Sequence, residues 1–209
     1  MDTISSLALC TVLVHLAGRF IWFQAFRDFL PQNRWKKMAL SFIILALLNF
    51  IFYYVLFQGF THTVILYKAS LALGWIPYVL LSFYWLPRFI AQQIFVLGMQ
   101  GLWRFFLHTA SILTIISLGR NIPVEWRLSM QLTCFLFYFL LSLPLAARMF
   151  RHMCPSRQLI NDKPYGYYIA FLPLLIAFTQ LPISLEPGLW TMDKLLSRIL
   201  TFVPFIALY

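Results

Sequence analysis

Long apolar runs alternate with short polar segments along the whole chain. A helix of about 20 apolar residues spans the hydrocarbon core of a bilayer, and most of these runs reach that length. The pattern therefore predicts an all-α, polytopic transmembrane helical bundle with six to seven spans. The expected spans are residues 4–26, 39–57, 64–85, 93–118, 128–147, 165–184 and 195–209.

The composition supports this prediction. Hydrophobic residues make up 62% of the 209 residues and charged residues 11%, against roughly 45–50% and about 25% in soluble domains. So few polar side chains cannot cover the surface of a soluble domain of this size, and the apolar content excludes a disordered chain. We expect one transmembrane domain over 1–209, located in the cell membrane with the lipid bilayer as its main partner.

The basic residues predict the orientation of the chain. Lysine and arginine total 16 against 6 acidic residues, a formal net charge of +10. In a soluble protein this excess would suggest nucleic acid, but here the basic residues collect in loops, as they do on cytoplasmic sides. The loops after the first, third and fifth runs hold Arg27, Arg34, Lys36, Lys37, Arg88, Arg148, Arg151, Arg157 and Lys163. We therefore expect the N-terminus outside, the C-terminus in the cytoplasm, and no nucleic acid partner.

The final run, 195–209, is shorter than a full crossing. We expect it to be a last helix cut short, with a cytoplasmic domain following after Tyr209. Six spans followed by an interfacial tail is the alternative.

A polar stripe marks the fourth run. At 100° per residue, Gln93, Gln100, Arg104, His108 and Ser111 fall within an arc of about 80°. Polar and ionisable groups are costly in lipid and mark functional sites. We expect this stripe to face the interior of the protein, and we take its five residues as candidate ligand-binding residues.

Two other runs carry weaker versions of the same pattern. His15 and Arg19 share a face of the first run, and Asn49 and Tyr53 lie one turn apart in the second. Together with Lys68 of the third run, these residues could line one polar pocket with positive fixed charges. His15, Arg19, Asn49 and Tyr53 complete the set of candidate ligand-binding residues.

The acidic residues limit what this pocket can do. All six lie outside the central spans, so no carboxylate is available within the membrane to pair with Arg104. An unpaired arginine requires carbonyls, glutamines or an anionic ligand, and a peptide or small anionic molecule is the expected ligand. Arg19, Lys68 and Arg198 lie near span ends, where they are more often interfacial anchors than ligands.

Motifs for catalysis are missing from the sequence. It contains no HExxH, GxSxG or phosphate-binding loop and no paired carboxylates. Cys10, Cys134 and Cys154 are too few and too dispersed for a disulfide scaffold, and Cys154 with the nearby His152 supplies only two ligands, which do not make a metal site. We expect no catalytic residue, metal or cofactor in this chain.

Two segments resemble a known family. Residues 73–78, Leu-Gly-Trp-Ile-Pro-Tyr, and the stretch from Phe95 through Trp103 to His108 resemble the membrane sensor regions of GHKL-type receptor histidine kinases. The peptide-pheromone receptors of the accessory-gene-regulator system belong to this family. The resemblance implies a signal-receiving domain of a two-component system and a homodimer, with kinase activity only in a cytoplasmic part.

Two other classes compete with this interpretation. A multi-pass transporter, or a substrate-binding membrane component for an anionic small molecule, would also explain the stripe in the fourth run. A membrane enzyme is the third class, and the missing acid–base pairs make it the weakest.

Overall fold

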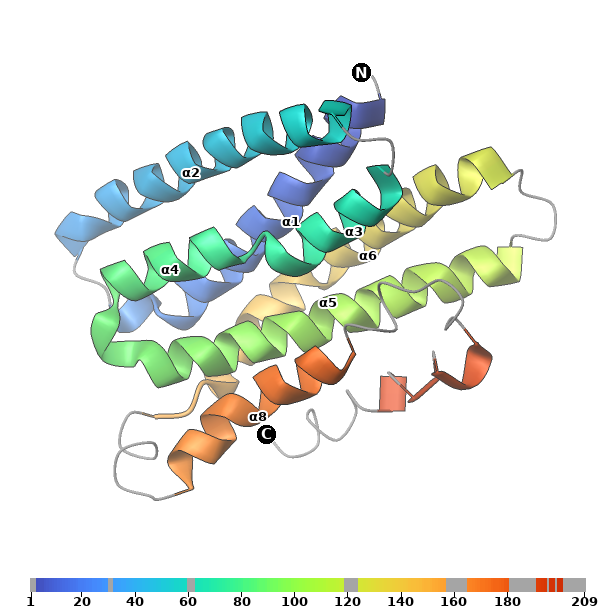
Figure 1. The fold of residues 1–209 in the computed structure, drawn as a ribbon. Helices are drawn as coiled ribbons and strands as arrows, with labels where there is room; N and C mark the ends of the chain where they lie inside the picture. Colours follow the sequence, from blue (N-terminus) through green and yellow to red (C-terminus); the bar gives the residue numbers. More distant parts are fainter. Residues whose placement is uncertain are drawn as a thin grey trace.

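The computed structural model describes residues 3–29, 32–59, 63–118, 124–156, 165–180, 191–194, 196–197 and 199–200. Every regular element labelled over these residues is a helix (Figure 1), which confirms the all-α class. The α-helices are α1 (Thr3–Ala25), α2 (Gln32–Gly59), α3 (Thr63–Leu73), α4 (Ile76–Trp85), α5 (Ile90–Leu118), α6 (Val124–Met153) and α8 (Gly166–Thr179). Short 3-10 turns, η1 (Arg27–Phe29) and η2 (Pro87–Phe89), follow α1 and α4.

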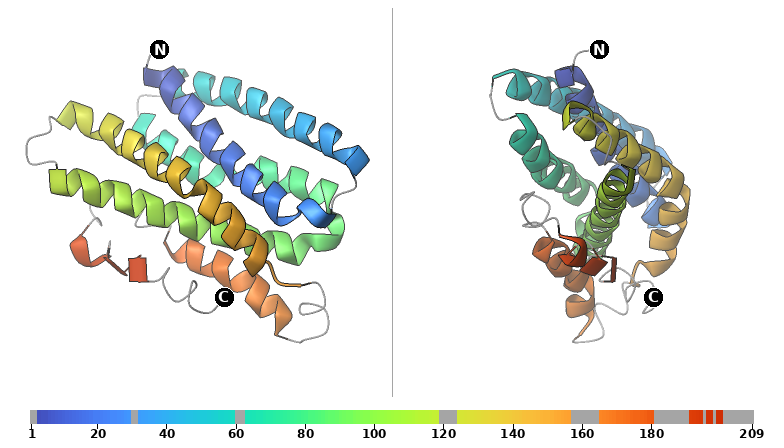
Figure 2. Two further views of the ribbon diagram at one scale, coloured as in Figure 1. Left: turned by 180° about the vertical axis from the view of Figure 1, so that it is seen from behind. Right: turned by 90° about the vertical axis from the view of Figure 1, so that its right-hand side faces the viewer.

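Two helices form the centre of the bundle. Helix α1 packs against α2, α3, α5 and α6, and α5 packs against α1, α4, α6 and α8. Figures 1 and 2 show α2 at one outer edge and α8 at the other, with α1 and α5 between them. Along the chain α1, α2, the pair α3 and α4, α5 and α6 run in alternating directions (Figure 1).

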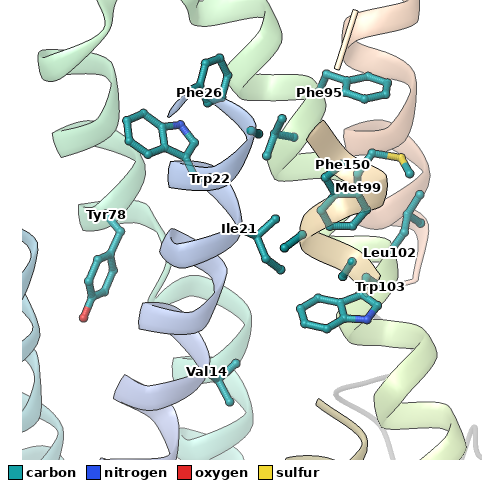
Figure 3. Close-up of a cluster of buried hydrophobic side chains, with 14 of the residues drawn as sticks. Val14, Ile21, Trp22, Phe26, Tyr78, Phe95, Met99, Leu102, Trp103 and Phe150 are labelled. Atoms are coloured by element: carbon teal, nitrogen blue, oxygen red, sulfur yellow. The ribbon is translucent and has the colours of Figure 1, made fainter. Parts of the chain in front are cut away.

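The apolar core lies where α1, α5 and α6 meet. Ile21 and Trp22 of α1, Met99 of α5 and Phe150 of α6 are each 1% exposed or less. Figure 3 shows Ile21 pointing from α1 toward Phe150 and Met99. Trp103 extends the core and packs on Phe139, with ring centroids 4.7 Å apart.

Four of the described helices are long and apolar enough to cross a membrane. These candidate spans are Leu7–Ala25, Arg34–Gly59, Pro87–Leu118 and Thr133–Met153. Helix α8 is apolar but shorter, at 14 residues or about 21 Å. The fold is thus compatible with a membrane protein.

The third predicted span is not one continuous helix. The sequence predicted one span over 64–85, but the structure divides it into α3 and α4 at Gly74 and Trp75. Pro77 has no N–H to donate to the Leu73 carbonyl, and its ring crowds the preceding turn. Gly74 still donates to the Ser70 carbonyl (2.8 Å), and regular bonding resumes when Val79 donates to Trp75 (3.0 Å).

Two predicted loops are shorter than expected. Helix α2 begins at Gln32, so Arg34, Lys36 and Lys37 lie in its first turns rather than in a loop, and α6 continues to Met153. Helices extend beyond the apolar run because lysine and arginine are good helix formers. Of the predicted last run, 195–209, only 196–197 and 199–200 are among the described residues.

Candidate functional site

One buried arginine joins three helices. Arg19 of α1 is only 4% exposed. Its Nη1 donates to Ser82 Oγ of α4 (3.0 Å), and its Nη2 donates to Gln100 Oε1 of α5 (3.2 Å). Gln100 Nε2 donates in turn to the Gly18 carbonyl of α1 (2.8 Å). Arg19 therefore does not extend its side chain to the protein surface, because neighbouring helices supply acceptors in the interior.

The partners of Arg19 are oriented by their own helices. The Ser82 hydroxyl donates to the Tyr78 carbonyl one turn earlier (2.7 Å), which leaves its oxygen lone pairs available to accept from Arg19. At Gly18, an added Cβ would lie 3.4 Å from Gln100 Oε1. This is an ordinary van der Waals distance, so Gln100 of α5 can reach the backbone of α1 without requiring a glycine at position 18.

The break between α3 and α4 forms a second junction. His15 Nε2 of α1 lies 3.3 Å from the Ser70 carbonyl. A Cβ on Gly74 would overlap the Tyr53 hydroxyl of α2 and would lie 2.7 Å from His15 Nε2. Only glycine at 74 permits these groups to approach this closely, so α1, α2 and the broken helix meet there.

Tyr78 connects the two junctions. Its ring centroid lies 5.8 Å from that of His15, and its ring stacks on Phe42 of α2 at 6.4 Å. Asn49 of α2 lies beside the Tyr78 hydroxyl. The sequence-predicted residues His15, Arg19, Asn49 and Tyr53 thus come together around α4.

Arg104 lies one turn beyond Gln100 on α5 and is half-buried. Its charge acts on both Arg19 and His15. Among the residues that the structure describes, its guanidinium makes no hydrogen bond, and the sequence contains no acidic residue from 29 through 124. Among the described residues, the site is therefore positively charged and contains no carboxylate.

We call these residues together the polar cluster. Its members are His15, Arg19, Asn49, Tyr53, Tyr78, Ser82, Gln100 and Arg104. They lie on α1, α2, α4 and α5. Such an arrangement can hold helices together or bind an anion, but it lacks the carboxylates on which proton relays usually depend.

The rest of the predicted stripe lies elsewhere. Gln93 donates to the Leu86 carbonyl at the end of α4 (2.7 Å). His108 Nε2 lies 3.2 Å from Gln131 Nε2 of α6, and Ser111 Oγ donates to the His108 carbonyl (2.7 Å). The stripe is thus divided: Gln100 and Arg104 face the polar cluster, whereas His108 faces α6. The side chain of Lys68 lies outside the described residues.

Several residues of the site were not among those predicted from the sequence. Ser82 and Ser70 are single serines in an apolar run, and serine is common in membrane helices, so neither was distinctive. Gln131, like Gln100, is a polar residue within a predicted span, and the same argument could have identified it. Gly74 and Pro77 together in one run could have indicated the helix break.

No three His, Cys, Asp or Glu side chains gather into a possible metal site within the described parts of the chain. Comparisons with protein-family models, with curated proteins and with solved structures found no significant match.

Proposed function

We propose that this chain is an integral membrane signal-receiving domain, similar to the sensor part of a GHKL-type receptor histidine kinase. It would respond to an extracellular or membrane-borne ligand. The observation that supports the proposal is the buried guanidinium of Arg19, which joins α1 to Ser82 of α4 and Gln100 of α5. Packed interiors rearrange between discrete states rather than deforming continuously. A ligand that binds one state of the polar cluster better would shift the balance between states.

Helix α5 offers a route from the polar cluster to the next helix. Gln100 lies in the cluster, and the neighbouring Gly98 and Gly101 lie against α8. A Cβ on Gly98 would overlap the backbone of Leu174, and one on Gly101 would lie 3.1 Å from Ala177 Cβ. Because the two backbones touch at Gly98, a shift of α5 would move α8 as well.

The proposed topology has an outside N-terminus and alternating crossings. Reporter fusions test it: a fusion at 30–31 should be cytoplasmic, and one at 60–61 should be extracellular. The opposite result at both positions would remove the proposed orientation and, with it, ligand capture from outside.

The gene itself tests the link to a kinase. The nucleotide sequence downstream of the codon for Tyr209 should encode a histidine-kinase core, and autophosphorylation of the full product should respond to a variant such as Gln100→Leu that disturbs the polar cluster. A stop codon directly after Tyr209 would contradict the kinase link.

A transporter for a small anionic molecule is the second candidate, and the break at Gly74 and Trp75 favours it. Many secondary transporters form their substrate sites at discontinuous membrane helices. Uptake of labelled acetate into proteoliposomes, abolished by Arg104→Ala, would favour a transporter. Binding without uptake would favour a receptor.

A further inference from the structure

The outer face of α2 carries an arrangement that the proposed function does not use. Helix α2 packs mainly against α1, α3 and α4 and lies at an outer edge of the bundle (Figures 1 and 2). Trp35 holds its first turns against α1, because its ring stacks on Phe23 with centroids 5.2 Å apart. Met38, three residues further along α2, is fully buried. The opposite face of these turns therefore points away from the bundle.

Two lysines lie at the start of this outer face. At 100° per residue, Lys36 and Lys37 lie about 40° and about 60° to either side of Leu40, and all three side chains are exposed. Neither these lysines nor the exposed Arg34 beside them makes an ion pair with a described residue. The nearest acidic residue along the sequence is Asp28, whose side chain lies outside the described residues. This end of α2 thus presents a local excess of positive charge.

An exposed apolar stripe continues from the lysines along α2. Its residues repeat at intervals of four, three and four positions, which keeps them on one helix face. We call it the outer stripe, and its members are Leu40, Ile44, Leu47 and Ile51, all exposed. From its first to its last residue the helix rises about 16 Å, close to half of the roughly 30 Å hydrocarbon core of a bilayer. The outer stripe therefore matches the depth of one lipid leaflet, with the lysines at the level of the headgroups.

We propose that this face of α2 binds an anionic phospholipid, with Lys36 and Lys37 holding its phosphate and the outer stripe contacting an acyl chain. Basic residues at the end of a membrane helix attract anionic headgroups, whereas a zwitterionic lipid brings its own positive group to the lysines. The inference goes beyond the proposed function. It requires the bundle to lie in a membrane, but it requires neither a kinase nor an external ligand.

The charges favour a lipid over a second copy of this chain as the occupant of the outer stripe. Two copies with the same orientation in one membrane, packed through this face, would place their lysines at the same depth. Like charges would then meet where little water separates them. An anionic lipid instead places a negative group at that depth and hydrocarbon beside the outer stripe.

Helix α6 offers a matched comparison within the chain. Its exposed Leu141, Leu145 and Arg148 follow one another at intervals of four and three residues, so an arginine also continues an apolar stripe there. Arg148 lies about 60° to one side of Leu145, but the position about 40° to the other side is Met149. Helix α6 therefore has one cation where α2 has a flanking pair, and we expect it to bind the lipid more weakly.

Native mass spectrometry of the full chain, purified in a zwitterionic detergent, tests the lipid site. Protein carrying one bound lipid is counted while palmitoyl-oleoyl phosphatidylglycerol or phosphatidylcholine is added. The first phosphatidylglycerol should bind at least about fivefold more tightly than the first phosphatidylcholine. Glycerol 3-phosphate, a soluble phosphate ester, should not displace it at the same concentration, because it has no acyl chain for the outer stripe.

Variants assign the binding to the two lysines. Lys36→Gln combined with Lys37→Gln should weaken phosphatidylglycerol binding about tenfold or more and leave phosphatidylcholine binding unchanged. Lys36→Arg combined with Lys37→Arg retains both charges and should restore the preference. Arg148→Gln is the matched control and should weaken the binding of the first phosphatidylglycerol by less than about twofold, because that lipid occupies α2. All of these replaced side chains are exposed, so the variants should fold.

Equal affinity for the two lipids, or unchanged affinity in the glutamine variant, would overturn the proposal. An equal loss in Arg148→Gln would also overturn it, because general attraction to the basic end of the bundle would then explain the binding. Displacement by glycerol 3-phosphate would make the occupant a soluble anion, and a dimer that excludes the lipid would make it a second copy. Both results contradict a lipid site. None of these outcomes bears on the reporter fusions or the kinase core.

Discussion

Helices α1 and α2 are neighbours with opposite surroundings. In α1, 61% of the residues in the span are buried within the protein, against 22% in α2, although α2 is the more apolar of the two. In water, the more apolar helix would occupy the core. In a bilayer, the most apolar surface can face lipid at no cost, and the helix with polar groups must lie inside.

The polar residues of the two helices account for this difference. Arg19 and His15 place hydrogen-bonding groups on the buried face of α1. Helix α2 contributes only Asn49 and Tyr53 to the polar cluster, both on the side that faces α1 and α4. Its remaining surface presents large apolar side chains, including Leu40, Ile43, Leu47, Ile51 and Val55.

Replacing an isoleucine by alanine in α1 and in α2 should give the largest difference in the free energy of unfolding. Ile21 of α1 is 0% exposed and Ile51 of α2 is 59% exposed. Ile21→Ala should lower the free energy of unfolding by about 2–4 kcal/mol, because it leaves a cavity against α5 and α6. Ile51→Ala should change it by less than about 0.5 kcal/mol. Unfolding of the purified variants in mixed micelles measures both, and equal losses would contradict the position of Ile51 on the outer surface of the bundle.

Removing a hydrogen-bond partner of Arg19 should have the next largest effect. Gln100→Leu should lower the free energy of unfolding by about 2–3 kcal/mol, because it removes an acceptor from a buried cation. Gln58→Leu, at the exposed end of α2, is the matched control and should be nearly neutral. A neutral Gln100→Leu variant would mean that the Arg19 network contributes little to stability.

A methyl group at Gly98 should separate α5 from α8. Gly98→Ala should lower the free energy of unfolding by about 1–3 kcal/mol, because the Cβ overlaps the backbone of Leu174. Gly59 of α2 has no atom within 4 Å of an added Cβ, so Gly59→Ala should leave stability unchanged or slightly higher. Cysteine crosslinking between α5 and α8 in the variants gives an independent check. The yield of the crosslink should fall only for Gly98→Ala.

The smallest change in stability is expected at Arg104. Because Arg104 is half-buried and makes no hydrogen bond to the described residues, Arg104→Gln should alter the free energy of unfolding by less than about 1 kcal/mol. Relief of its repulsion with Arg19 favours a small gain. A loss of several kcal/mol in the same unfolding assay would show that Arg104 is structural, in contrast to its predicted role in ligand binding.

The helical class and the interior position of Gln100 follow from the sequence, because lipid excludes both open strands and polar side chains. The hydrogen-bond partners of the buried polar side chains do not follow from the sequence. That Arg19 meets Ser82 rather than the interface depends on how α4 lies against α1 and α5, and helical periodicity contains no information about contacts between helices. The same holds for His108, whose place in the stripe did not indicate that it would meet Gln131 of α6.

Arg19 and Gln100 hold α1 and α5 together through a direct hydrogen bond. A double-mutant cycle of Arg19→Leu and Gln100→Leu, read from the free energies of unfolding, measures that interaction. The structure predicts a favourable coupling energy of about 1–2 kcal/mol between the two side chains. Strictly additive effects of the two substitutions would contradict it.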